Sequence, residues 1–168
     1  MQDIEIVKIE TVCFTGHRII SRDRAIKIPR VLEMLISGLV AMGAKSFRVG
    51  GAIGFDTIAA LSVLEAKEKN PQITLDLILP CRDQANGWNE NNTKAYNYIL
   101  SQADSISYVC DKYRKGCMHE RNRRLVDGSD MLIAYLEKKD GGSAYTYNYA
   151  EEKGIEIINI YDILKNEE

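Results

Sequence analysis

The feature that most constrains the fold is a regular alternation between short, largely apolar runs and longer stretches with helical spacing. The runs predict strands at residues 11–15, 46–49, 73–79, 105–109, 131–135 and 155–160. Helices are predicted between these strands, at about 28–42, 58–66, 88–100, 119–126 and 141–153. Each helix is indicated either by apolar residues at helical spacing or by a glycine turn that leads into the segment. Strands that alternate with helices form βαβ units, whose strands run parallel. The sequence therefore predicts an α/β fold: a single Rossmann-like, doubly wound, mainly parallel sheet with helices on both faces.

The details of the pattern support one continuous domain over residues 1–168, with a core at about 11–160. The first helical stretch has Ile28, Val31 and Leu32 on one face, which places Pro29 in its first turn and makes Gly43 its stop. The strands look almost continuously apolar, as expected when helices cover both faces of a sheet. No repeat, low-complexity tract or linker divides the chain.

Charge and length limit the partners. The chain has 22 Lys and Arg against 24 Asp and Glu, a formal charge of −2, so nothing attracts it globally to nucleic acid, and nucleic acid is not an expected partner. No apolar run approaches the roughly 18 residues of a membrane span, and the acidic start is unlike a signal peptide. We therefore expect no membrane contact and a cytoplasmic location.

The four cysteines do not have the spacing of a metal site. The nearest pair, Cys110 and Cys117, has six residues between its members, and His119 beside it gives only a weak zinc pattern. Free thiols in a reducing compartment, with no metal and no cofactor, are the expectation.

Three turns that follow predicted strands are candidates for a ligand site. The first is Gly50-Gly51-Ala52-Ile53-Gly54, which is neither a dinucleotide fingerprint nor a P-loop. The second is Gly141-Gly142-Ser143-Ala144, and the third is Thr15-Gly16-His17-Arg18. Glycines let the backbone approach an anion closely, and a helix start offers free N–H groups. Each glycine turn has the alternative of a tight connection without a ligand, which has more weight for the second turn than for the first. All three turns, however, meet at the carboxyl edge of a parallel sheet, where ligands bind.

Charged and aromatic residues add to this prediction. Arg18 can grip a phosphate through its planar head, whereas His17 fits a structural or ligand-contacting role better than that of a catalytic base. Of the arginines at 121, 123 and 124, Arg121 is predicted to face the ligand and the other two the solvent, because helix neighbours point about 100° apart. They could also form only a solvated helix face. Trp88 either pins a helix to the sheet or stacks on a base.

Several strings together resemble the SLOG superfamily. They are Met118-His119-Glu120-Arg121-Asn122, Ser129-Asp130-Met131-Leu132-Ile133-Ala134 and Gly141-Gly142-Ser143-Ala144-Tyr145. The superfamily includes the Lonely-guy phosphoribohydrolases and the DNA-processing protein A fold. The chain most resembles its YpsA-like branch, through the Thr-Gly start, a Gly-x-x-Gly turn, Pro80, Gln84, Trp88 and Gln102-Ala103-Asp104. The resemblance covers about residues 11 to 160 and implies a nucleotide pocket in a homo-oligomer.

The chain departs from the phosphoribohydrolase pattern where those relatives carry a Pro-Gly-Gly-x-Gly-Thr-x-x-Glu turn. Here Asp140, Ala144, Tyr145 and Asn148 replace the proline, the third glycine of that turn, the threonine and the glutamate. An asparagine cannot supply the charge of the missing carboxylate. The resemblance thus implies binding or sensing of a phosphorylated nucleotide or an ADP-ribose-like compound. One alternative is an N-glycosidase that acts on nucleoside monophosphates, and a second is DNA binding as in DNA-processing protein A.

The expected site combines these turns and strings. The candidate catalytic residues, needed only for the N-glycosidase, are Glu120 and Asp56. The expected ligand-binding residues are Thr15, Gly16, His17, Arg18, Gly50, Gly51, Gly54, Asp56, Pro80, Trp88, Arg121, Asn122, Gly141, Gly142, Ser143 and Ala144.

Overall fold

The computed structural model, which describes residues 7–168, contains six strands and six helices in strict alternation. The strands are β1 (Thr11–Gly16), β2 (Ser46–Val49), β3 (Thr74–Leu79), β4 (Ser105–Tyr108), β5 (Met131–Tyr135) and β6 (Glu156–Asn159). The helices are α1 (Arg22–Ala41), α2 (Phe55–Lys69), α3 (Glu90–Gln102), α4 (Cys117–Val126), α5 (Gly141–Lys153) and α6 (Ile160–Asn166).

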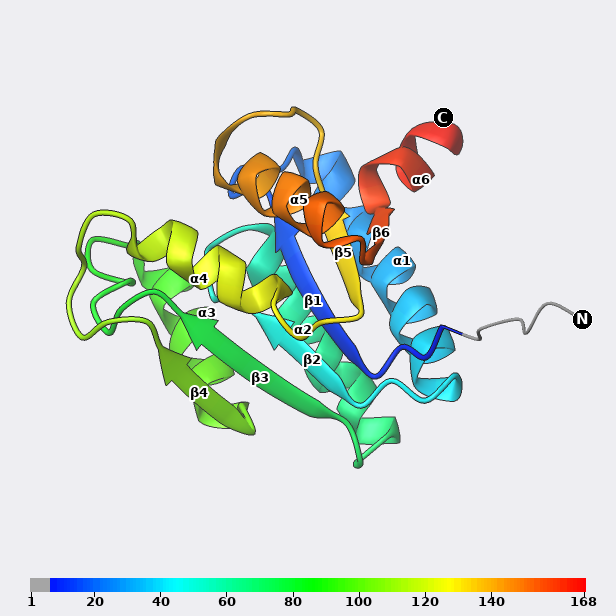
Figure 1. Cartoon of the computed structure of the whole chain (residues 1–168), viewed down its shortest axis with the longest axis horizontal. Coiled ribbons are helices and arrows are strands. Elements are labelled where there is room, and N and C mark those ends of the chain that lie inside the picture. Colours follow the sequence, from blue (N-terminus) through cyan, green and yellow to red (C-terminus); the bar gives the residue numbers. More distant parts are fainter. Residues whose placement is uncertain (1–6) are drawn as a thin grey trace, which may run out of the picture.

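All strands join one sheet in the order β4-β3-β2-β1-β5-β6, and every pair is parallel (Figure 1). The chain moves outward from β1 to β4 and then returns to the other side of β1, where β5 pairs with it from Val12↔Met131 to Gly16↔Tyr135. The strand order therefore reverses between β1 and β5, and a crevice opens beyond their carboxyl ends. The predicted α/β, Rossmann-like, doubly wound fold is confirmed.

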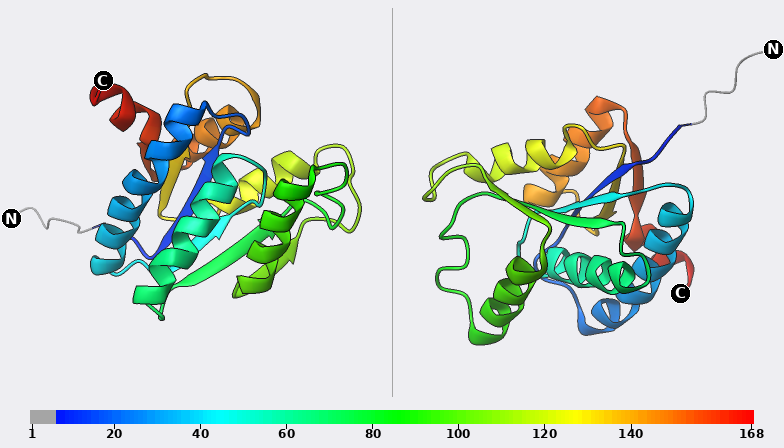
Figure 2. Two further views of the ribbon diagram at one scale, coloured as in Figure 1. Left: turned by 180° about the vertical axis from the view of Figure 1, so that it is seen from behind. Right: turned by 90° about the horizontal axis from the view of Figure 1, so that it is seen from below.

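Two helical layers sandwich the sheet (Figure 2). One layer holds α1, α2, α3 and α6, and its apolar faces meet the sheet in the main core around Phe14, Phe47 and Leu77. The other layer holds α4 and α5, which pack on a smaller core around Leu125 and Leu132. Among residues 7–168, no helix combines the length and apolar character of a membrane span.

The placement of Pro29 in a first turn was wrong. Helix α1 begins at Arg22, where Ser21 caps it by accepting the N–H of Arg24 through its side chain at 3.4 Å. Polar residues at the helix start hid this from an apolar pattern. Pro29 therefore lies inside the helix, at an exposed position, and lacks the N–H that would bond to the carbonyl four residues earlier.

Two other expectations differ from the structure. The final strand ends at Asn159, whose side chain accepts the N–H of Tyr161 at 3.2 Å and so starts α6. The strands are also not uniformly buried: β5 is buried throughout, whereas β3 alternates and β4 is largely exposed. Helix α4 packs over β3 and β1, and α5 packs over β1, β5 and β6, so the cover of this face thins towards the β4 edge.

Candidate functional site

A cavity of about 430 Å³ lies beyond the carboxyl ends of β1 and β5, where the strand order reverses. Four segments form its wall: the end of β1 with the turn after it, the turn into α2 with the first residues of that helix, one face of α4, and the start of α5 with its capping residue. The wall consists of Thr15, Gly16, His17, Arg18, Ala52, Asp56, Met118, His119, Arg121, Asn122, Leu125, Asp140, Gly141, Gly142 and Ser143.

The turn after β1 is locked to its neighbours. A Cβ on Gly16 would lie 2.5 Å from ring atoms of Phe55, so only glycine fits there. The Nε2 atom of His17 accepts the backbone N–H groups of Glu137 at 2.9 Å and Lys138 at 3.1 Å. An imidazole that accepts through Nε2 carries its proton on Nδ1. His17 thus fixes the loop after β5, and Arg18 next to it is exposed at the cavity.

The glycines of the turn after β2 have inward contacts and do not line the cavity. The carbonyl of Gly50 accepts a hydrogen bond from Nη1 of Arg121, and a Cβ there would lie 2.6 Å from that nitrogen. Gly51 has φ 72°, and its Cβ would lie 2.5 Å from Cδ2 of Leu79. Gly54 has φ 79° and packs directly on the Arg18 carbonyl. These glycines shape the turn that carries Asp56 to the cavity.

A buried aspartate and a buried arginine both line the cavity. Asp56 is 6% exposed and accepts the N–H of Ala52 at 3.1 Å, and Arg121 is 5% exposed and donates from Nε to Asn122 at 2.8 Å. Burial raises the pKa of Asp56, while the charges of Arg121 and Arg18 oppose the rise. Burial likewise lowers the pKa of Arg121. Two arginines against one buried aspartate make this part of the wall suited to an anion.

The start of α5 strengthens the preference for an anion. Gly141, Gly142 and Ser143 form the first turn and line the cavity, and the capping residue Asp140 makes no side-chain hydrogen bond to the helix. The first N–H groups of a helix have no partner within it and carry about half a positive charge. An uncapped helix start in a cavity is a common way to bind phosphate or carboxylate.

An aromatic pair forms the rim between α4 and α5. The His119 ring stacks on Tyr145 with centroids 4.1 Å apart and planes 6° from parallel. Tyr145 is held in turn, because its hydroxyl accepts a hydrogen bond from Arg123 at 2.8 Å. His119 lines the cavity, so the stack gives one side of it a flat aromatic surface.

Other sequence-predicted residues lie away from this cavity. The Glu120 carboxylate bonds to Arg114 at 2.7 Å and Arg124 at 3.2 Å, and the bond from Arg114 is the main cause that lowers its pKa. Trp88 packs edge-on against Tyr96, with ring centroids 5.2 Å apart. Three further positions also lie outside the wall: Pro80, Ala144 and the exposed Asn148.

The wall also contains residues that were not among the expected ligand-binding residues, namely Ala52, Met118, His119, Leu125 and Asp140. A helical pattern could have predicted Met118 and Leu125, since positions 118, 121, 122 and 125 share one face of a helix. Within residues 7–168, no group of three or more His, Cys, Asp and Glu side chains is arranged to hold a metal ion.

The YpsA family model, described as the YspA SLOG family, matches residues 15–164. The UPF0398 protein of Bacillus thuringiensis (strain Al Hakam) is 32% identical over 141 residues, which cover 82% of this chain and 77% of the relative.

Two solved structures share the fold. DNA processing protein A from Helicobacter pylori, described with a single-stranded DNA binding mode, superposes with a TM-score of 0.66 and 23% identity, covering 89% of this chain and 64% of that one. DNA processing protein A from Streptococcus pneumoniae superposes with a TM-score of 0.66 and 20% identity, covering 90% of this chain and 50% of that one. The chain thus spans less than two thirds of either protein.

Proposed function

This chain belongs to the YspA SLOG family, and from that premise we propose that it binds a phosphorylated nucleotide or a nucleotide-derived small molecule of the ADP-ribose kind. The observation that carries the proposal is the uncapped start of α5, which shares one cavity with Arg18 and Arg121. A volume of about 430 Å³ lies within the range of small-molecule pockets, roughly 300–1,000 Å³.

We assign the phosphate to the start of α5. The N–H groups of Gly141, Gly142 and Ser143 offer hydrogen bonds, and Gly142 has no side chain to block them. Arg18 is exposed and forms no ion pair within residues 7–168, so it can close over a phosphate with two parallel hydrogen bonds. Arg121 is held further back by Gly50 and Asn122 and contributes chiefly its charge.

The base is assigned to the aromatic rim. One face of His119 is covered by Tyr145, and the exposed imidazole can offer its other face to a purine or pyrimidine. Stacking of a base on an aromatic side chain contributes about 1–3 kcal/mol. A nucleotide placed this way spans the gap between α4 and α5, with its sugar towards Asp56.

Calorimetric titration with adenosine, AMP and ADP-ribose tests this placement, preceded by native mass spectrometry for a co-purified nucleotide. If the start of α5 holds a phosphate, AMP and ADP-ribose bind and adenosine binds at least tenfold more weakly, a difference of about 1.4 kcal/mol. Equal affinity for adenosine and AMP would contradict the phosphate assignment.

An N-glycosidase is the second candidate, and the observation that favours it is the position of Asp56 in the cavity wall. Cleavage of a glycosidic bond needs a carboxylate near the sugar. Glu120 is outside the wall and paired with two arginines, and Asn148 replaces the carboxylate of the phosphoribohydrolase pattern. Asp56 does line the cavity, but burial favours its neutral form. Chromatography of free base after incubation with nucleoside monophosphates distinguishes the two; release that stops in Asp56→Asn would establish the enzyme.

DNA binding is a third candidate, favoured by the fold shared with DNA processing protein A. The charge balance of 22 basic and 24 acidic residues opposes it. Titration with single-stranded DNA at low and high salt tests this candidate, because phosphate contacts weaken steeply as salt rises.

We also propose that the protein is cytoplasmic and forms a homo-oligomer. Light scattering after size exclusion measures the oligomeric state.

A further inference from the structure

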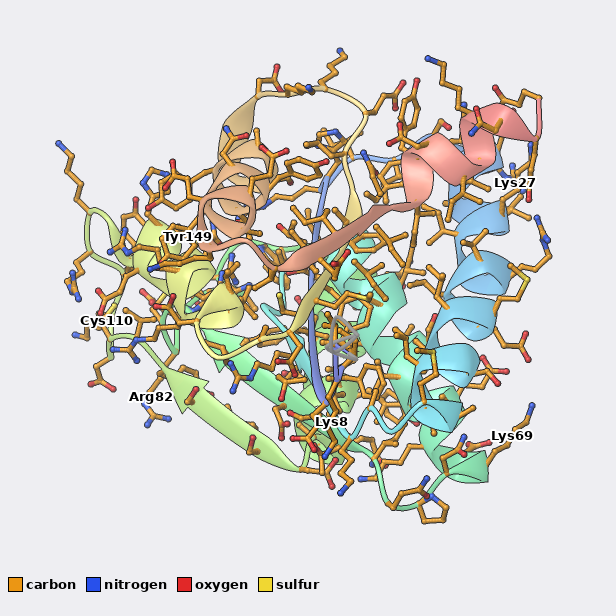
Figure 3. The ribbon with its side chains drawn as sticks, turned by 45° about the vertical axis from the view of Figure 1, so that its right-hand side comes forward. Lys8, Lys27, Lys69, Arg82, Cys110 and Tyr149 are labelled. Atoms are coloured by element: carbon orange, nitrogen blue, oxygen red, sulfur yellow. The ribbon has the colours of Figure 1, made fainter. Side chains whose placement is uncertain are left out.

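A second cavity, of about 540 Å³, adjoins the first one at the carboxyl edge of the sheet. It lies between the turn after β1 and the loop that connects β5 to α5, and its lining residues are His17, Arg18, Ile19, Glu137, Lys138 and Asp140. Three of these residues, His17, Arg18 and Asp140, also line the first cavity. Figure 3 shows the loop at the top of the view, with side chains that extend from it into open space. The two cavities therefore share part of their walls.

Hydrogen bonds hold the backbone of this loop in place. Its first residues are fixed by His17, whose Nε2 atom accepts the N–H groups of Glu137 at 2.9 Å and Lys138 at 3.1 Å. Just before them, the side chain of Asn159 accepts the N–H of Leu136 at 3.0 Å and donates to its carbonyl at 2.9 Å. None of these bonds uses the side chain of Glu137 or Lys138. The second cavity thus has fixed walls whose charged side chains are available to a ligand.

The charges that line the second cavity balance, with Arg18 and Lys138 against two carboxylates. The carboxylates belong to Glu137 and Asp140, and none of the four groups forms an ion pair within residues 7–168. A balanced wall has no preference for a further phosphate, but its carboxylates accept hydrogen bonds from hydroxyl groups. Ile19, which is 90% exposed, adds an apolar surface to the same wall. A sugar matches both features, because its hydroxyl groups donate and its C–H face packs on apolar side chains.

We propose that the second cavity binds a sugar that is joined to the nucleotide through a pyrophosphate. The inference rests on the proposed function and deepens it, because it makes the ligand a nucleoside diphosphate sugar. One phosphate lies at the start of α5, and the other lies by Arg18, which lines both cavities. The sugar hydroxyls donate to Glu137 and Asp140, and the Lys138 ammonium donates to a sugar oxygen.

Calorimetric titration of the full chain with AMP, ADP and ADP-ribose tests the second cavity. ADP has the same pyrophosphate as ADP-ribose and a further negative charge, but it has no sugar beyond that pyrophosphate. If charge alone set the affinity, ADP would bind more tightly than ADP-ribose. We expect ADP-ribose to bind more tightly than ADP by about fivefold or more, the effect of one net hydrogen bond.

The variant Glu137→Ala separates the sugar from the phosphates. It should weaken the binding of ADP-ribose about fivefold and leave the binding of ADP no weaker, because only the sugar uses this carboxylate. The backbone N–H that bonds to His17 remains, so the loop keeps its position. Lys138→Ala and Lys139→Ala are a matched pair, because both lysines are exposed in the same loop and only Lys138 lines the cavity. Lys138→Ala should weaken the binding of ADP-ribose by about threefold or more, and Lys139→Ala by less than about twofold.

The outcomes distinguish the sugar site from the proposed nucleotide site. If AMP binds but ADP-ribose binds no more tightly than ADP, the sugar site is overturned and the nucleotide site stands. ADP-ribose that binds Glu137→Ala as tightly as the original protein, or more tightly, overturns the sugar site as well. Equal losses in Lys138→Ala and Lys139→Ala would assign the effect to net charge and remove Lys138 from the site. No binding of AMP, ADP or ADP-ribose would overturn the proposed function and the sugar site together.

Discussion

The contrast between Gly51 and Gly142 gives the sharpest test of how the glycine turns work, because sequence alone treats them alike. Gly51 has φ 72°, a conformation that costs an alanine about 1–2 kcal/mol. Its Cβ would also lie 2.5 Å from the buried side chain of Leu79, and such overpacking costs about 1–3 kcal/mol. Gly51→Ala should therefore destabilise the fold by about 2–5 kcal/mol. For a chain of this size that corresponds to a fall in Tm of about 4–20 °C.

Gly142→Ala should leave the stability of the fold almost unchanged and weaken ligand binding. Gly142 is exposed, its φ is not positive, and the nearest atom to an added Cβ is Nδ2 of Asn122 at 3.8 Å. Stability should stay within about 0.5 kcal/mol of the original. The methyl group would stand in the cavity over the first turn of α5, and we expect at least tenfold weaker binding of ADP-ribose.

Thermal unfolding with and without ADP-ribose measures both effects. At 100 times its original Kd, the ligand should stabilise the unmodified protein and Gly51→Ala by about 2.7 kcal/mol, and Gly142→Ala by no more than about 1.4 kcal/mol. A stable Gly51→Ala that has lost ligand stabilisation would refute the reasoning, since it would place Gly51 on the ligand. An unchanged ligand effect in Gly142→Ala would equally remove the start of α5 from the site.

Three further predictions concern the wall. Burial raises the pKa of Asp56 above 3.8, so the folded state holds the proton more tightly than the unfolded state. This contribution to stability is lost as pH rises through the folded pKa. Urea unfolding over a pH series should therefore show Asp56→Asn gaining stability relative to the original protein as pH rises. His119→Ala should weaken the binding of AMP by about 1–3 kcal/mol in calorimetry and leave the binding of pyrophosphate unchanged. Equal losses for both ligands would contradict stacking of the base on His119. Arg18→Ala should lose about 1.5–3 kcal/mol of AMP binding, whereas Arg124→Ala, whose side chain pairs with Glu120 outside the wall, should lose almost none; the reverse order would exchange their roles.

Much of the architecture was predictable because it depends on local patterns. The alternation of strands and helices predicted a parallel sheet, and the carboxyl edge of that sheet is where Arg18 and Gly142 were expected and where the structure places them. The errors had local causes as well. Ser21 starts α1 with polar residues that no apolar pattern detects, and the apolar run 155–160 conceals the change at Asn159 from strand to helix.

The sequence by itself determined which residue types stand at the ends of the strands, because chain order and periodicity decide which segment comes after each strand. Only the tertiary structure decided which way they face. Gly51 turns into the core against Leu79 while Gly142 turns to the cavity, although both belong to Gly-Gly turns between a strand and a helix. Arg121 is buried and Glu120 is drawn away by two arginines. The physical reason is that orientation depends on packing between elements distant in the chain, here α4 against α5 and the turn after β2, and no local pattern records those contacts.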